Sequence, residues 1–384
     1  LVGGVPVQYQ KDGETRGDFV RLVDWAKPAA NEYLAVNQFT ILGPKNNRRP
    51  DIILFINGLP LVLLELKNPA DVNADLWKAY EQIQTYKEQI PDLFHYNEIL
   101  IITDGTEARM GSLSANAERF SRWRTIDGVG LDPLGAFSEM ETLMRGVLEP
   151  RMLMDFLRYF VLFEEDGVLV KKIAGYHQFH AVRAAIEQVV TASRPGGTQK
   201  GGVVWHTQGS GKSITMTCFA ARIMQETAME NPTIVVITDR NDLDGQLFGV
   251  FSLSQDLLRE QPVQISTRGD LREKLNNRPS GGIVFATIQK FAPGADEDSF
   301  PVLSNRHNIV VIADEAHRTQ YGFSAELKAP EPLKAAEDKA VYQVGYAQHL
   351  RDALPNATFV AFTRYPVRIA IPVRYLVITS MSTT

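Results

Sequence analysis

Five short apolar runs, separated by longer polar or helix-like stretches, occupy the second half of this chain. They are residues 202–205, 234–238, 283–287, 309–313 and 358–362. Such alternation is typical of a parallel sheet with helices on both faces. Because ligands of these sheets lie beyond the carboxyl ends of the strands, we expect the functional side chains of this half to lie there.

A glycine-containing loop follows the first run, where residues 205–213 read WHTQGSGKS. Gly209 and Gly211 let backbone N–H groups approach an anion, and a helix beginning near Lys212 directs its positive end to the same place. We expect a phosphate-binding loop, with Lys212 at the β and γ oxygens and the Ser213 hydroxyl on Mg²⁺. The expected nucleotide-binding residues of this loop are Thr207, Gly209, Ser210, Gly211, Lys212 and Ser213.

One position of this loop departs from the usual pattern. His206 stands where the first glycine of a phosphate-binding loop usually lies. The alternative interpretation is a surface loop rich in glycine and serine.

Two acidic residues follow the buried-type run at 309–313. Asp314 and Glu315 precede Ala316 and His317. A carboxylate at a strand end can hold Mg²⁺, and its neighbour can polarise the attacking water. We therefore assign Asp314 to the metal, Glu315 to general base catalysis and His317 to the nucleotide site. A helix N-cap followed by an acid is the alternative.

In this order, these segments resemble a superfamily 2 helicase or translocase with a DEAH-type box. The resemblance makes Gln178 the reader of adenine and places residues 238–243 and 286–291 against the DNA backbone. Residues 362–366 read FTRYP where the family usually has Thr-Gly-Thr-Pro, which leaves the coupling role of Thr363 open. We expect the second motor lobe to lie outside this chain, so the chain alone should bind ATP poorly and not translocate DNA.

The first half of the chain has a different rhythm of strand, hairpin, strand, helix and strand. The runs 51–56 and 61–66 are joined through Asn57-Gly58, a strong two-residue hairpin signal. Glu65 and Lys67 are two residues apart on a strand and share a face. Since the hairpin can bring Asp51 beside Glu65, we expect both carboxylates to bind Mg²⁺ and Lys67 to orient the water or stabilise the transition state.

A helix expected at 73–89 carries Gln82 and Tyr86 on one face, and a buried strand is expected at 99–103. The Pro-Asp…Glu-x-Lys residues resemble the PD-(D/E)xK nuclease motif, and Gln82 with Tyr86 resembles the Gln-x-x-x-Tyr signature of its RecB-like branch. The resemblance adds both to the catalytic residues. A charged strand end beside a solvated helix is the alternative.

Together the two halves resemble the restriction (motor) subunit of type I restriction-modification enzymes. This implies an α/β protein in which a restriction-endonuclease-like mixed-sheet domain (1–126) precedes a helical connector (127–170) and a RecA-like doubly wound lobe (171–384). It also implies ATP and Mg²⁺ as cofactors, and double-stranded DNA with specificity and methyltransferase subunits as partners. A helicase–nuclease of DNA repair or phage defence, and a non-catalytic DNA-binding assembly module, are the alternatives.

Composition limits these readings. The 384 residues carry a net charge of −5, so DNA binding must use local basic groups rather than a strong positive balance. One cysteine excludes an internal disulfide framework. No run is apolar for the roughly 20 residues of a membrane span, and no signal peptide is recognisable, so we expect no membrane partner and a cytoplasmic protein. Helices are expected at 137–148 and 152–163.

Overall fold

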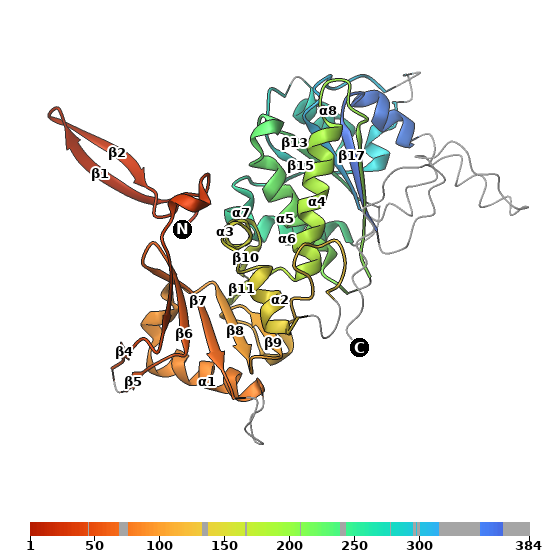
Figure 1. The fold of residues 1–384 in the computed structure, drawn as a ribbon. Coiled ribbons are helices and arrows are strands. Elements are labelled where there is room, and N and C mark those ends of the chain that lie inside the picture. The colour runs from red at the N-terminus through yellow and green to blue at the C-terminus, as the bar shows by residue number, and fades with distance from the viewer. Residues whose placement is uncertain are drawn as a thin grey trace, which may run out of the picture. The chain divides into compact units, whose positions relative to one another are not determined.

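The computed structural model describes residues 1–44, 46–68, 76–132, 137–165, 167–207, 209–238, 243–276, 278–294, 297, 300–314 and 346–363. They belong to two compact units, Leu1–Tyr176 and His177–Thr384 (Figure 1).

The first unit is built around a mixed five-stranded sheet. Its strand order is β3-β6-β7-β8-β9, in which only β7 and β8 pair in parallel. This confirms the mixed sheet expected for this half. The strands are β3 (Tyr33–Asn37), β6 (Ile52–Ile56), β7 (Leu59–Leu66), β8 (Ile99–Thr103) and β9 (Ala108–Gly111).

The expected two-residue turn joins β6 to β7. Asn57 has φ of 50° and Gly58 has φ of 81°. Two successive residues with positive φ match the primed turns whose twist fits a hairpin, and Asn and Gly adopt this backbone most readily. The hairpin prediction is therefore confirmed, and β7 begins two residues earlier than the apolar pattern indicated.

Helix α1 (Leu76–Gln89) connects β7 to β8 and covers one face of the sheet. Its buried side chains recur at helical spacing and pack on alternate residues of the strands. Leu63 is among those strand residues, and Glu65 shares its face of β7 because side chains alternate. The α1 residues in this core are Leu76, Ala79, Ile83 and Tyr86.

A helix predicted at 152–163 is partly wrong. Helix α3 (Pro150–Tyr159) ends before Val161, and β10 (Val161–Glu165) pairs antiparallel with β11 (Leu169–Ile173). The apolar run Val161–Phe163 is compatible with a helix or a strand, and its pairing with β11 makes it a strand. The remaining elements of this unit are β1 (Val5–Lys11), β2 (Glu14–Val20), β4 (Ile41–Leu42), β5 (Asn47–Arg48), α2 (Glu139–Arg145) and the 3₁₀ helices Pro28–Ala30, Pro91–His95 and Ala117–Arg119.

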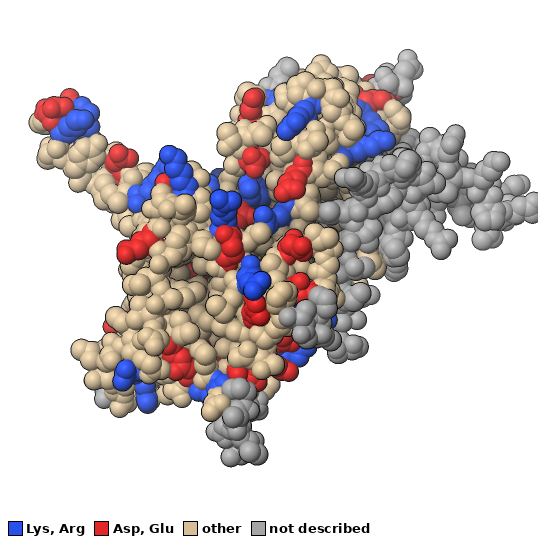
Figure 2. Space-filling model, viewed as in Figure 1, with Lys and Arg blue, Asp and Glu red and all other residues tan. Residues whose placement is uncertain are grey.

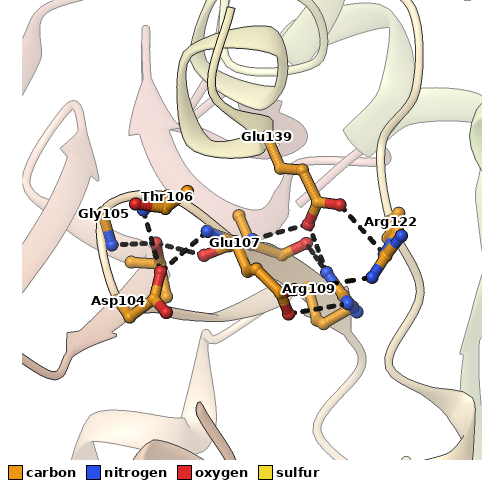
Figure 3. A network of polar contacts seen from close by, with 9 residues as sticks. Asp104, Gly105, Thr106, Glu107, Arg109, Arg122 and Glu139 are labelled. Atoms are coloured by element: carbon orange, nitrogen blue, oxygen red, sulfur yellow. Dashed lines mark hydrogen bonds and ion pairs between the residues drawn. The ribbon is translucent and has the colours of Figure 1, made fainter. Parts of the chain in front are cut away.

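A polar network ties α2 to the outer strand β9 (Figure 3). Glu139, in the first turn of α2, forms ion pairs with Arg109 of β9 and with Arg122, whose Nε lies 3.0 Å from Oε1. It also accepts a hydrogen bond of 3.0 Å from the Ala108 backbone N–H. Glu107 pairs with both arginines as well. Two cations and two anions thus neutralise one another at the edge of the sheet.

The second unit contains a six-stranded sheet in which every described pairing is parallel. The strand order is β12-β17-β16-β13-β15-β14, which confirms the parallel sheet expected from the alternating apolar runs. The strands are β12 (Lys200–Trp205), β13 (Thr233–Thr238), β14 (Val263–Gln264), β15 (Ile283–Thr287), β16 (Ile309–Asp314) and β17 (Thr358–Thr363).

Helices separate these strands along the chain, as crossovers between parallel neighbours require. They pack against a core that includes Val, Ile and Phe side chains from β13, β15 and β16. The named helices are α4 (Tyr176–Ala192), α5 (Lys212–Met224), α6 (Leu243–Leu253), α7 (Gln255–Leu258), α8 (Arg268–Leu275) and the 3₁₀ helices Thr227–Met229 and Ile288–Phe291.

Basic and acidic side chains are interspersed on the face shown in Figure 2, in keeping with a net charge of only −5. Among the described residues, no helix combines the length and the apolar character needed to cross a membrane.

The network in Figure 3 makes a stability prediction. Replacement Glu139→Gln should lower the free energy of unfolding by about 1–3 kcal/mol, because it removes a charged acceptor from two arginines. Glu141→Gln is the matched control: it lies on the same helix, pairs with Arg145 in solvent, and should cost at most about 0.5 kcal/mol. Urea unfolding measures both, and equal losses would contradict the assignment.

Candidate nuclease and nucleotide sites

Strand pairing brings Asp51 and Glu65 together. Ile52 of β6 lies opposite Leu64 of β7, so the next residues outward in the antiparallel register are Asp51 and Glu65. The Leu66 backbone N–H donates to Asp51 Oδ2 at 2.8 Å, which fixes the carboxylate against the end of β7. Both predicted carboxylates therefore face the same spot.

The carboxyl group of Glu65 is buried beside one basic side chain. It is 3% exposed, and Lys67 Nζ lies 3.1 Å from its Oε1. Burial raises the pKa of Glu65 above its ordinary value, and the negative charge of Asp51 raises this pKa further, whereas Lys67 and Tyr86 oppose the shift. One ammonium group thus stands against two carboxylates, which leaves the cluster short of positive charge.

Helix α1 adds the two residues that the sequence placed on one of its faces. Burial raises the pKa of the Tyr86 hydroxyl, as do the charges of Glu65 and Asp51, whereas a hydrogen bond with Gln82 lowers it. Tyr86 therefore lies close enough to both carboxylates for their charges to affect its hydroxyl, and Gln82 lies beside Tyr86. The structure brings together all five predicted nuclease residues.

A residue that sequence reasoning missed completes this cluster. Gln38 Nε2 donates to Asp51 Oδ1 at 2.7 Å, and the Gln38 backbone N–H donates to the Asp51 carbonyl at 3.0 Å. The Gln38 carbonyl accepts from Arg49 Nε at 3.2 Å. Gln38 has a φ of 51°, a backbone conformation uncommon outside glycine. Nothing in the local sequence indicates this long-range contact.

The cluster fits a hard divalent cation. Glu65 Oε2 is buried and has no hydrogen-bond partner among the described residues, and an unpaired buried carboxylate oxygen is costly unless a cation or water meets it. Within the part of the chain that the structure describes, no group of three or more His, Cys, Asp or Glu side chains could hold a metal. A cation here would therefore rely on two carboxylates, with water or carbonyl oxygens completing its shell.

In the second unit, the loop after β12 has the backbone that a phosphate-binding loop needs. Gly209 and Gly211 have φ of 79° and 80°, and Gly211 precedes the first residue of α5, Lys212. A side chain at Gly211 would lie 2.5 Å from Gln178 Nε2. The positive φ of Gly211 is the feature that favours glycine there, and a Cβ would in addition displace the end of the Gln178 side chain.

Lys212 and Asp314 meet although about a hundred residues separate them. Their Nζ and Oδ1 atoms lie 2.5 Å apart, and both side chains are largely buried. Lys212 follows β12 and Asp314 ends β16, with only β17 between these strands. Because the strands are parallel, their carboxyl ends lie at one edge of the sheet. The phosphate-binding loop and Asp314 meet at this edge.

Helix α4 supplies two further side chains to this loop. Gln178 Nε2 donates to the Gly211 carbonyl at 3.0 Å and to the Ser210 carbonyl at 3.3 Å, and His177 Nε2 lies 3.2 Å from the Ser210 carbonyl. Gln178, predicted to read adenine, therefore lies directly against the phosphate-loop backbone.

A polar pocket of about 370 Å³ lies elsewhere in this unit. One wall comes from the segment 286–291, which the sequence placed against DNA. Another comes from the start of α8, which sequence reasoning missed because only the packing of α8 against the 3₁₀ helix Ile288–Phe291 reveals it. The lining residues are Ser266, Thr267, Arg268, Thr287, Gln289, Lys290 and Tyr346.

Several predicted positions lie outside the described residues. These are Glu315 and His317 of the acidic segment, residues 239–242, and residues 364–366 after Thr363. Thr238 and Thr363 are described, and both are buried at strand ends.

Two family descriptions match this chain. "Type I restriction enzyme R protein N terminus" matches residues 1–119, and "SWI2/SNF2 ATPase" matches residues 177–371. Among solved structures, the yeast DEAD-box splicing factor Prp28 is similar over 43% of this chain and 37% of its own, with 13% identity and a TM-score of 0.27. The fold and the two family matches define a chain with an ATPase region of the SWI2/SNF2 class.

Curated relatives give the same assignment along nearly the whole chain. The type I restriction enzyme HindI endonuclease subunit of Haemophilus influenzae is 48% identical over 96% of this chain. A putative type I restriction enzyme endonuclease subunit, MjaIXP, of Methanocaldococcus jannaschii is 33% identical over 96%. The chain belongs to the family of type I restriction enzyme endonuclease (R) subunits. It spans 34% of the length of each of these relatives.

The charge imbalance at Glu65 makes a testable prediction. A carboxyl group with a raised pKa in the folded state contributes stability below its unfolded pKa and loses it as the pH rises through the folded pKa. Replacement Glu65→Gln should remove that loss, so the variant should unfold at a higher temperature than the wild type at neutral pH without metal.

Adding Mg²⁺ should reverse the order of the two unfolding temperatures. At a hundred times its dissociation constant, Mg²⁺ should stabilise the wild type by about 2.7 kcal/mol and stabilise Glu65→Gln much less. Thermal melts with and without Mg²⁺ measure both effects, with the exposed Glu81→Gln as the control. Equal stabilisation of wild type and Glu65→Gln would show that the cation binds elsewhere.

Proposed function

We propose that this chain is the part of a type I restriction endonuclease subunit that cleaves DNA phosphodiester bonds with Mg²⁺ and binds the ATP that drives translocation of double-stranded DNA. The observation that carries the proposal is the buried Glu65 Oε2 beside Asp51 and Lys67, which has no hydrogen-bond partner in the described part of the chain. Family membership supports a cytoplasmic complex with specificity and methyltransferase subunits, which would read the DNA sequence.

In the nuclease site, each side chain has a separate task. Mg²⁺, when bound, supplies an activated water and charge stabilisation at the phosphate. Asp51 and Glu65 would hold it, and Gln38 and the Leu66 N–H keep the Asp51 carboxylate turned toward Glu65. Lys67 would place its ammonium beside the phosphate oxygens as negative charge develops. Tyr86 and Gln82 would orient Glu65 from α1.

In the second unit, the residues around the phosphate loop would bind ATP with Mg²⁺. Lys212 would exchange its bond to Asp314 for the β and γ phosphate oxygens, and Asp314 and Ser213 would then hold the cation. Glu315, which lies outside the described residues, remains our proposed general base. Gln178 would contact adenine from α4, next to the loop that it already touches.

The polar pocket beside α8 would bind a DNA backbone phosphate. Hydroxyl, amide and basic groups at strand and helix ends are the usual partners of phosphates, and this pocket gathers Thr287, Gln289, Lys290 and Arg268. Contacts of this kind fix the position of DNA without reading its sequence, as a translocating motor requires.

A nicking assay tests the nuclease proposal. Supercoiled plasmid with Mg²⁺ should be nicked by the wild type, and Asp51→Ala should lower the rate by more than about 100-fold, beyond the loss expected for an outer-shell partner of a metal. Asp92→Ala, an exposed carboxylate of the same unit, should match the wild type. Equal nicking by wild type and Asp51→Ala would sink the proposal.

The DNA contact is tested through its salt dependence. Replacement Lys290→Ala should weaken binding of unrelated DNA duplexes by similar factors and reduce the slope of log K against log salt by about 1. Lys274→Ala, on the exposed side of α8 beside Glu273, is the control and should leave the slope unchanged. Anisotropy titrations at several salt concentrations measure it, and an unchanged slope for Lys290→Ala would rule out the contact.

A further inference from the structure

His206 occupies the loop position where a glycine is usual, and the structure shows what it does there. It follows β12 and is 2% exposed. Its backbone N–H donates to the Thr363 carbonyl at 2.9 Å, which extends the β12–β17 pairing by one bond beyond the Trp205–Thr363 pair. The backbone of His206 is thus fixed to the end of β17.

The ring of His206 bonds the loop in a defined protonation state. Ser210 Oγ donates its only proton to the Thr207 carbonyl at 2.8 Å, so it can only accept from His206 Nδ1, which lies 3.0 Å away. Nδ1 must therefore carry a proton. Burial, with the charges of His177 and Lys212, lowers the pKa of His206 to about 4, so the ring is neutral and its Nε2 is an acceptor. Nε2 is buried and has no partner among the described residues.

These bonds hold Ser210 from two sides. His206 and the Thr207 carbonyl fix its hydroxyl, while His177 and Gln178 of α4 fix its carbonyl. Ser210 lies between two glycines with positive φ, residues that lose the most conformational freedom on ordering. A loop fixed before it meets its ligand binds more tightly because less ordering remains to be done.

We infer that His206 is a positioning residue that braces the phosphate loop through Ser210 and fastens that loop to the end of β17 at Thr363. This rests on the proposed nucleotide site and goes beyond it, since His206 itself need not touch the nucleotide. A histidine in place of glycine at this position is compatible with a functional loop, because the hydrogen bond from its side chain to Ser210 fixes the loop conformation.

Paired substitutions test the brace. His206→Asn keeps an N–H donor near the position of Nδ1 and gives up only Nε2, for which the described residues offer no hydrogen-bond partner. His206→Gln moves its amide toward the position of Nε2 and loses the donor. We expect His206→Ala and His206→Gln to weaken Mg-ATP binding about tenfold, the value of one hydrogen bond. His206→Asn should stay within about twofold of the wild type.

The partner side chain provides a second readout. Ser210→Ala should weaken binding as His206→Ala does, and the double variant should be no weaker than either single one, because the same bond is lost. Calorimetric titration of the full chain with Mg-ATP measures these affinities. The exposed His307→Ala is the matched control. Additive losses, or equal weakening in His206→Asn and His206→Ala, would overturn the inference.

A spectroscopic measurement separates this inference from the proposed function. In chain labelled with ¹⁵N-histidine, the His206 signals, identified by their loss in His206→Asn, should show the proton on Nδ1 at neutral pH. A proton on Nε2 would overturn the brace even if ATP binds. Because this chain alone is expected to bind ATP poorly, weak but saturable binding by the wild type fits the proposed nucleotide site. No binding even at millimolar Mg-ATP, with the proton found on Nδ1, would sink that site and leave the brace standing.

Discussion

Hydrogen bonds between two strands hold like charges together in the first unit of this protein. The β6–β7 pairing fixes Asp51 and Glu65 side by side, although the negative charge of Asp51 helps to raise the pKa of Glu65. Among the described residues, Lys67 is the basic side chain that forms an ion pair with Glu65. Such an arrangement is unfavourable for an isolated fold and favourable once a divalent cation is present. The rest of the unit serves this constraint: α1 covers Glu65, and Gln38 holds Asp51 in place.

In the second unit, by contrast, the two buried charges described at the proposed site already balance. Lys212 and Asp314 neutralise each other at the carboxyl edge of a parallel sheet. A phosphate group could take the place of Asp314 beside Lys212, and the cation of the phosphate could take the place of Lys212 beside Asp314. Around this pair, side chains from α4 and from the end of β12 fix a loop whose glycines would otherwise leave it flexible. Each unit thus has charged side chains at strand ends, where they could pair with the charges of its proposed ligand.

Periodicity and register explain what could be predicted from the sequence. Glu65 and Lys67 share a strand face, Asn57-Gly58 sets the turn, and parallel strands bring Lys212 to Asp314, all from local spacing. Contacts that neither strand spacing nor the order of parallel strands fixes could not be predicted. Gln38 reaches Asp51 through an unusual backbone conformation, and the start of α8 faces Lys290 only through packing. Val161–Phe163 became a strand because β11 pairs with it, which helical spacing alone does not reveal.

The central claim is that two carboxylates, brought together by one hairpin, form a metal site for cleaving DNA. Anomalous diffraction from a crystal of the chain soaked in Mn²⁺ tests this most directly. The account predicts one anomalous peak contacting oxygens of both Asp51 and Glu65, which disappears in Asp51→Ala. A peak bound by other residues of this unit, or an empty site between the two carboxylates at saturating Mn²⁺, would contradict it.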